Sequence, residues 1–205
     1  MAPGRVVGVD AAPAAIGAAR ASADGPEFQV GDVYRLGFPD ASFDVVHAHQ
    51  LLQHLADPVG ALAEMGRVCR PGGLVAARDS DYAAMTWYPA DVRLDAWLDL
   101  YRRVARANGG EPDAGRRMLA WARAAGFTRV EASASVWCFA TAADRRWWGG
   151  LWAERMTESD VARRAVELDA ASPAELADMA VAWRGWAEAE DAWFAVLHGE
   201  VLIRP

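Results

Sequence analysis

The chain has 205 residues, of which 53% are hydrophobic, so it is long enough for one globular domain with a sizeable core. Its formal net charge of −7 argues against nucleic acid or an anionic membrane as a partner, because both attract clustered positive charge. Cys69 and Cys138 lack further Cys or His at ligand spacing, so we expect no disulfide framework, no metal site and a cytoplasmic location.

Short β-branched runs alternate with alanine-rich segments of helical spacing, a pattern typical of an α/β fold. A strand over residues 5–9 leads into Asp10, and Pro13 then opens a helix. Asp57 before Pro58 signals the start of another helix. The sequence RPGG at 70–73 is predicted to end this helix and to form a turn into the next strand. The predicted strands are 5–9, 27–30, 43–47, 74–78, 128–139 and 193–203.

The composition changes at about Asp81, where Trp, Tyr, Arg and Asp become frequent. We therefore divide a single domain into a cofactor-binding half (1–80), an inserted tryptophan-rich helical cap (81–126) and a C-terminal part (127–205). Ser172 and Glu175 have the spacing of a capping box. The predicted helices of these two later parts include 118–125, 147–156, 159–168 and 172–190.

Two acidic residues follow predicted strands, at the edge where open parallel sheets bind ligands. Asp10 is placed to accept hydrogen bonds from ribose hydroxyls, although an acid there also caps the following helix. Asp32 could accept from the exocyclic amine of adenine while Val33 covers the ring, or it could simply initiate a turn. The pattern thus allows a nucleoside site and leaves a structural role open for both acids.

Histidines follow the strand predicted at 43–47. His54 is interpreted as a structural anchor of the loop that leads to the next helix. His49 is the candidate for cofactor contact or for taking a proton from an acceptor hydroxyl, because an imidazole transfers protons near neutral pH. A purely structural histidine is the alternative in each case.

Four segments over residues 4–78 together resemble the class I S-adenosylmethionine-dependent methyltransferases: VVGVD, GDVYRLGFPDASFDVV, HQLLQHLADP and MGRVCRPGG. The resemblance is greatest to the small-molecule enzymes of ubiquinone and menaquinone biosynthesis. It implies a Rossmann-like sheet with helices on both faces and S-adenosylmethionine as cofactor. The cofactor-binding residues that it implies are Asp10, Ala11, Asp32, Val33, Ala48 and His49, the last also as the catalytic candidate.

The family's first strand, which lies at the centre of its sheet and carries a Gly-rich turn, would precede Gly4. The sheet is therefore expected to lack this strand. A truncated start is our preferred explanation. Direct pairing of the two flanking strands and a strand borrowed from another chain are the alternatives, because two exposed strand edges are costly.

The acceptor pocket is predicted around Asp81, Tyr82, Trp87 and Trp147, with Asp79 also near the expected site of methyl transfer. Loop capping and core packing are the structural alternatives for these acids and tryptophans. The predicted reaction is methyl transfer to an oxygen, nitrogen or carbon atom of a small molecule, by a chain that could form a homodimer. A pseudoenzyme or interaction module is the alternative, whereas a nicotinamide-dependent dehydrogenase is disfavoured because the chain has no lysine for a Tyr-x-x-x-Lys pair.

Overall fold

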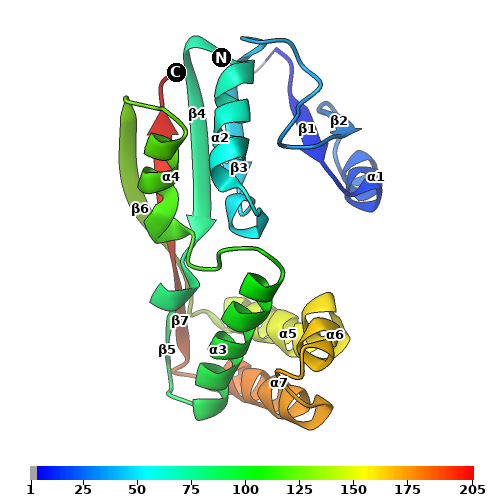
Figure 1. Ribbon diagram of the computed structural model, residues 1–205. Coiled ribbons are helices and arrows are strands. Elements are labelled where there is room, and N and C mark those ends of the chain that lie inside the picture. The colour runs from blue at the N-terminus through cyan, green and yellow to red at the C-terminus, as the bar shows by residue number, and fades with distance from the viewer. Residues whose placement is uncertain (1–3) are drawn as a thin grey trace.

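The computed structural model describes residues 4–205, in which α-helices alternate with strands as predicted for an α/β fold (Figure 1). The helices are α1 (Pro13–Ser22), α2 (Pro58–Val68), α3 (Val92–Ala107), α4 (Met118–Ala124), α5 (Ala142–Glu158), α6 (Asp160–Glu167) and α7 (Pro173–Glu188). The strands are β1 (Val7–Asp10), β2 (Glu27–Val30), β3 (Phe43–His49), β4 (Cys69–Ser80), β5 (Thr86–Tyr88), β6 (Val130–Phe139) and β7 (Trp193–Ile203). Short 3₁₀ turns occur at η1 (Leu52–His54), η2 (Tyr82–Ala84) and η3 (Gly115–Arg117).

The strands of the described part form two separate sheets. β1 and β2 pair in parallel, and β3 pairs in parallel with β4. The larger sheet then continues with the antiparallel strand β7, which pairs with β6 along one edge and with both β4 and β5 along the other. β7 is therefore the strand that joins all parts of the larger sheet.

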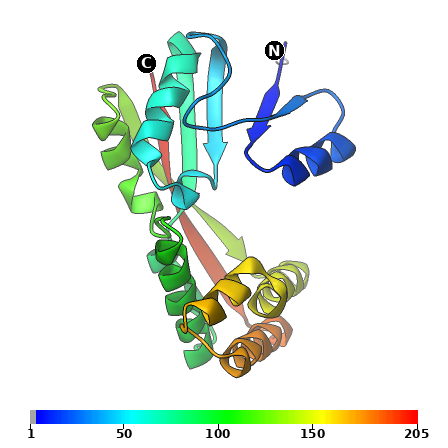
Figure 2. The same ribbon diagram turned by 45° about the vertical axis from the view of Figure 1, so that its right-hand side comes forward.

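β1 and β3 do not pair with each other, so the direct closure considered in the sequence analysis does not occur. Figure 2 shows the β1–α1–β2 unit standing beside β3 as a separate element. The two strands that flank the position of the family's central strand are thus present, and each has an edge without a strand partner among residues 4–205.

The larger sheet extends through two lobes of the molecule (Figure 1). In the sheet lobe, α2 and α4 cover one face of the sheet, with a core that includes Leu62, Val75 and Ile203. In the helical lobe, α3, α5, α6 and α7 surround an aromatic core of Trp97, Trp152, Trp183 and Phe194. Trp97 and Trp183 meet edge to face, with 4.7 Å between ring centroids, a favourable geometry for aromatic pairs.

The lobes meet where β7 crosses η3. A Cβ atom built on Gly199 would lie 1.9 Å from the carbonyl oxygen of Gly115, so the two backbones are in direct contact there. Only a residue without a side chain fits at Gly199.

Several local signals predict the elements well. β7 spans the predicted range 193–203, and Asp57 caps α2 by accepting the Gly60 N–H at 2.8 Å. The predicted turn at 70–73 instead lies within the bounds of β4, where Gly72 has a φ of +77°. α5 begins at Ala142, before the predicted 147, because Thr141 and Asp144 form a capping box.

Candidate functional site

A mostly apolar cavity of about 350 Å³ lies between β1 and β3, along the position that the family's central strand would occupy, and its volume is within the range of small-molecule sites. It reaches the carboxyl ends of β1 and β2, the edge at which open parallel sheets bind ligands. Five of the six predicted cofactor-binding residues line it, namely Asp10, Ala11, Asp32, Val33 and Ala48. The structure thus brings together residues that lie far apart in the sequence.

Asp10 ends β1, and its carboxylate makes the structural contact considered for it. Its Oδ1 accepts the backbone N–H of Ala12 at 2.7 Å, which anchors the turn into α1. Its Oδ2 accepts no hydrogen bond from residues 4–205, so this oxygen is available to a ligand hydroxyl in the pocket. The structural contact therefore uses one oxygen of the carboxylate and leaves the other without a partner in the described chain.

Asp32 follows β2 and is arranged in the same way. Its Oδ1 accepts the Tyr34 N–H at 2.9 Å in an Asx turn, while Oδ2 has no partner in the described chain. The Gly31 N–H donates to the Asp10 carbonyl at 3.0 Å, which joins the loops that carry the two acids. Both carboxylates consequently border the same pocket at neighbouring strand ends.

The loop after Asp32 is fastened to α2. The Tyr34 hydroxyl accepts the Asp57 N–H at 3.1 Å, and the Glu64 carboxylate accepts the Leu36 N–H at 2.6 Å. The hydrogen bond from Arg67 lowers the pKa of Glu64 more than burial raises it, so this acceptor stays ionised. The pocket wall is therefore held in place by the helix below it.

His49 does not line the pocket, although its neighbour Ala48 does. Its Nε2 lies 2.9 Å from Arg78 Nη1, and since a guanidinium can only donate, this nitrogen accepts. Burial lowers the pKa of His49, and the charges of Arg78 and His47 lower it further. In this arrangement the basic nitrogen of His49 is occupied, so it cannot take a proton from an acceptor without a rearrangement.

A buried polar cluster lies beyond the end of β3. His198 is fully buried; its Nδ1 lies 3.1 Å from the Val196 carbonyl and its Nε2 lies 2.8 Å from Gln50 Nε2. Ser80 and Gln53 also hydrogen-bond to the Gln50 side chain. Gln50 lies in the segment HQLLQHLADP but is not singled out there as a site residue, and His198, 148 residues away, belongs to no recognisable motif.

Asp79, named as a candidate near the reaction site, lies under the same loop. It is fully buried, and its two oxygens accept the N–H groups of Leu52 and Gln53 at 3.2 Å each. Burial raises the pKa of Asp79 to about 7, against the opposing effect of these backbone hydrogen bonds. Its geometry is that of an anchor for η1 and the loop at the end of β3.

The four residues predicted to form the acceptor pocket occupy separate environments. Tyr82 stacks on Tyr101, with 4.2 Å between ring centroids, and Trp87 stacks on Phe194 against the aromatic core. Trp147 is exposed on α5, and Asp81 is buried in an ion pair. None of the four lines the pocket between β1 and β3, and an acceptor role for them stays a prediction.

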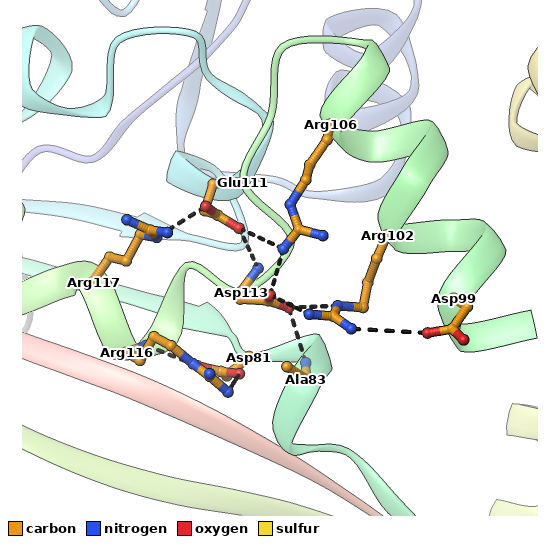
Figure 3. Close-up of polar contacts among 9 residues, drawn as sticks. All are labelled: Asp81, Ala83, Asp99, Arg102, Arg106, Glu111, Asp113, Arg116 and Arg117. Carbon is orange, nitrogen blue, oxygen red and sulfur yellow. Dashed lines mark hydrogen bonds and ion pairs between the residues drawn. The ribbon is translucent and has the colours of Figure 1, made fainter. Parts of the chain in front are cut away.

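Asp81 belongs to a polar network at the junction of the two lobes (Figure 3). Arg116 binds it through two guanidinium nitrogens at 2.7 Å each. Nearby, Asp113 accepts hydrogen bonds from Arg102, Arg106 and the backbone of Ala83. Both carboxylates are buried and fully engaged, so their contacts indicate a structural role.

Carboxylates at the ends of adjacent parallel strands, beside an apolar pocket, are the arrangement in which open α/β sheets hold nucleotide ligands. Comparison with known proteins identifies the family. A family model described as a methyltransferase domain matches residues 1–77. The chain is 32% identical over 222 residues to the protein named probable methyltransferase ltbC of Aspergillus luteorubrus, and the match covers 97% of this chain and 76% of that protein.

An uncharacterized methyltransferase of Schizosaccharomyces pombe is 35% identical over 179 residues, which cover 86% of this chain and 63% of that protein. The chain therefore spans less than two thirds of this relative's length. A crystal structure of a Bacillus halodurans protein has a similar fold, with a TM-score of 0.57 and 18% identity over 98% of this chain and 82% of that chain. The chain belongs to the class I S-adenosylmethionine-dependent methyltransferases, a family of enzymes with a Rossmann-like fold.

Proposed function

We propose that this protein transfers a methyl group from S-adenosylmethionine to a small-molecule acceptor. The observation that supports it is the position of Asp10 and Asp32 on one pocket, each with an unused carboxylate oxygen. In this proposal the free oxygen of Asp10 accepts from ribose hydroxyls and that of Asp32 from the adenine amine. Val33 and Leu51 supply apolar surface for the adenine ring.

The residues present fit the adenosine part of such a cofactor. The pocket is large enough for a small ligand, mostly apolar, and polar at the strand ends, as a nucleoside with one flat face and one hydroxylated side requires. When bound, S-adenosylmethionine supplies an electrophilic methyl group on a sulfonium. The chain's own task is then to align the acceptor and to exclude water, which explains why no catalytic triad is needed.

The charge of the chain bears on the kind of partner that it binds. The net charge of −7 supports a small-molecule partner over a nucleic acid. None of the helices in residues 4–205 has the length and apolar character that crossing a bilayer requires. A cytoplasmic location and a homodimer stay predictions. A pseudoenzyme that merely keeps the fold is less favoured, because it gives no reason for two ligand-ready carboxylates on one pocket.

The test is isothermal titration of the protein with S-adenosylhomocysteine. Asp10→Asn and Asp32→Asn should each weaken binding about tenfold or more, because each removes a charge-assisted hydrogen bond. Asp24→Asn is the matched control, since Asp24 is an exposed acid of the same unit that does not line the pocket. Absence of heat for the wild-type protein, or equal affinity of all variants, contradicts the proposal.

A further inference from the structure

We infer that the methyl acceptor binds as an oxyanion, such as a phenolate or enolate, with its oxygen held by the Gln50 side chain at the end of β3. This inference rests on the proposed methyl transfer and specifies its acceptor class. Ala48 and Leu51, which flank His49 and Gln50 in the chain, both line the cofactor pocket. His49 and Gln50 therefore lie between two pocket-lining residues along the chain.

The orientation of the Gln50 amide follows from its partners. A carbonyl only accepts, so the contact with Val196 places the proton of His198 on Nδ1. Burial, reinforced by the charge of Arg78, lowers the pKa of His198 to about 4, and the ring is neutral. Its Nε2 therefore accepts from Gln50, and the amide nitrogen of Gln50 faces His198.

The one group of the Gln50 side chain that is still free to form a hydrogen bond is then an N–H donor. Its Oε1 accepts from Gln53 Nε2 and lies 2.9 Å from Ser80 Oγ. Its Nε2 carries two hydrogens, of which one points to His198 and the other has no partner within residues 4–205. Because Gln50 is only half-buried, this N–H is available to a ligand.

His49 presents the same kind of group beside it. Its Nε2 accepts from Arg78, so in the neutral ring the proton is on Nδ1, which has no partner in the described chain. The rings of His49 and His198 lie 6.3 Å apart, and Trp137 packs against both, at 5.4 and 4.4 Å between centroids. The site thus offers two donors beside an aromatic ring.

Two N–H donors beside a cation favour the ionised form of a ligand hydroxyl. The two nearby carboxylates are already engaged: Glu200 accepts from Arg78, Ser133 and Ser135, and Asp79 accepts the backbone N–H groups of Leu52 and Gln53. Arg78, whose guanidinium lies 2.9 Å from His49 Nε2 and 4.7 Å from the centre of the Trp137 ring, adds positive charge here, so an acceptor with an acidic hydroxyl, bound in its ionised form, fits the chemistry. Trp137 indicates that this acceptor is planar.

The cost of the arrangement supports a functional role. Gln50 has a φ of +56°, which is unfavourable for a residue with a side chain, and such strain is concentrated at binding sites. His198, Ser80 and Gln53 are each at most 4% exposed, although buried polar groups are costly unless they are fully hydrogen-bonded. All three converge on the Gln50 side chain.

The test uses 4-nitrophenol as a probe, because its hydroxyl ionises near neutral pH and its anion absorbs visible light. Titrations with and without S-adenosylhomocysteine should show the anion bound about tenfold or more tightly than the neutral phenol, which lowers the probe's apparent pKa by about one unit. The neutral analogue 4-nitroanisole should bind at least as weakly as the neutral phenol. Gln50→Glu should abolish the pKa shift and leave the affinity for S-adenosylhomocysteine unchanged.

Gln29→Glu is the matched control, since Gln29 is a half-buried glutamine on β2 outside the pocket, and it should keep the shift. Equal binding of 4-nitrophenolate and 4-nitroanisole, no probe binding, or an unchanged shift in Gln50→Glu overturns the inference. If Gln50→Glu does not fold, the comparison of the two probes on the wild-type protein decides. Failure of S-adenosylhomocysteine to bind counts against the proposed function alone, because the probe is also titrated without it.

Discussion

Asp79 gives a prediction of how stability depends on pH. Asp79→Asn keeps the size of the side chain and removes its charge. The carboxyl group is fully buried, and its partners are the backbone N–H groups of Leu52 and Gln53, with no cation among its hydrogen bonds. Burial raises its pKa from the ordinary 3.8 to about 7, against the effect of those hydrogen bonds. The folded protein therefore holds this proton more tightly than the unfolded chain.

The sign and the size of the effect follow from linkage. A raised pKa stabilises the fold fully below pH 3.8, and this stabilisation is lost as the pH rises through 7. At 1.36 kcal/mol per pKa unit, the difference amounts to at most about 4 kcal/mol. The free energy of unfolding of the wild-type protein, relative to Asp79→Asn, should fall by up to this amount between pH 4 and pH 8.

Urea denaturation of both proteins at a series of pH values measures this difference. His198 acts in the opposite direction, because burial, helped by Arg78, lowers its pKa to about 4, so its contribution is lost as the pH falls from 6.5 towards 4. Subtracting the two curves removes that contribution, since both proteins contain His198. Parallel curves over the whole range would show that Asp79 is ionised in the fold and would refute the reasoning.

Further substitutions test the junction of the lobes. Gly199→Ala should destabilise the fold by about 3 kcal/mol or more, because the new Cβ meets the Gly115 backbone, whereas Gly17→Ala, in open space on α1, should be neutral or stabilising by up to about 1 kcal/mol. Thermal unfolding distinguishes the two, and equal melting temperatures would contradict the close backbone crossing. Asp113→Asn should cost about 2 kcal/mol at pH 7, less than a fully buried pair, since Arg102 is partly exposed. Burial raises the pKa of Asp113, but Arg102 and the other donors lower it by more, so the pKa lies below the ordinary 3.8. The stability difference between the wild-type protein and Asp113→Asn should therefore vanish as the pH falls below 3.8. Urea titrations that show the same loss of stability at pH 7 and below pH 3.8 would argue against this reasoning.

Local sequence signals predicted most of the fold. The closing stretch 193–203, predicted as a strand, matches the bounds of β7, and the Ser172–Glu175 capping box starts α7 as expected. Thr141 and Asp144 form an equally good box, which would have placed the start of α5 correctly. The short strand β5 was not predicted, because its three residues are defined by pairing with β7 and not by a pattern of their own.

The candidate site was predictable where it depends on strand ends. Asp10 and Asp32 directly follow strands, so their shared pocket follows from the topology of a parallel sheet. Partners distant in sequence were not predictable: Asp81 pairs with Arg116, and Gln50 meets His198, through contacts that only the folded chain creates. For the same reason the role of His49 could not be read from its type, since Arg78 occupies its accepting nitrogen.

β7 connects the stability of the helical lobe with the geometry of the acceptor site. Side chains alternate along a strand, so Phe194, His198 and Glu200 project from one face of β7. Phe194 lies in the aromatic core, His198 orients Gln50, and Glu200 pairs with Arg78. A shift of one residue in the pairing of β7 would turn all three to the opposite face. The aromatic core therefore does more than stabilise its own lobe, because by fixing the register of β7 it also fixes which end of the Gln50 amide, oxygen or nitrogen, faces a ligand.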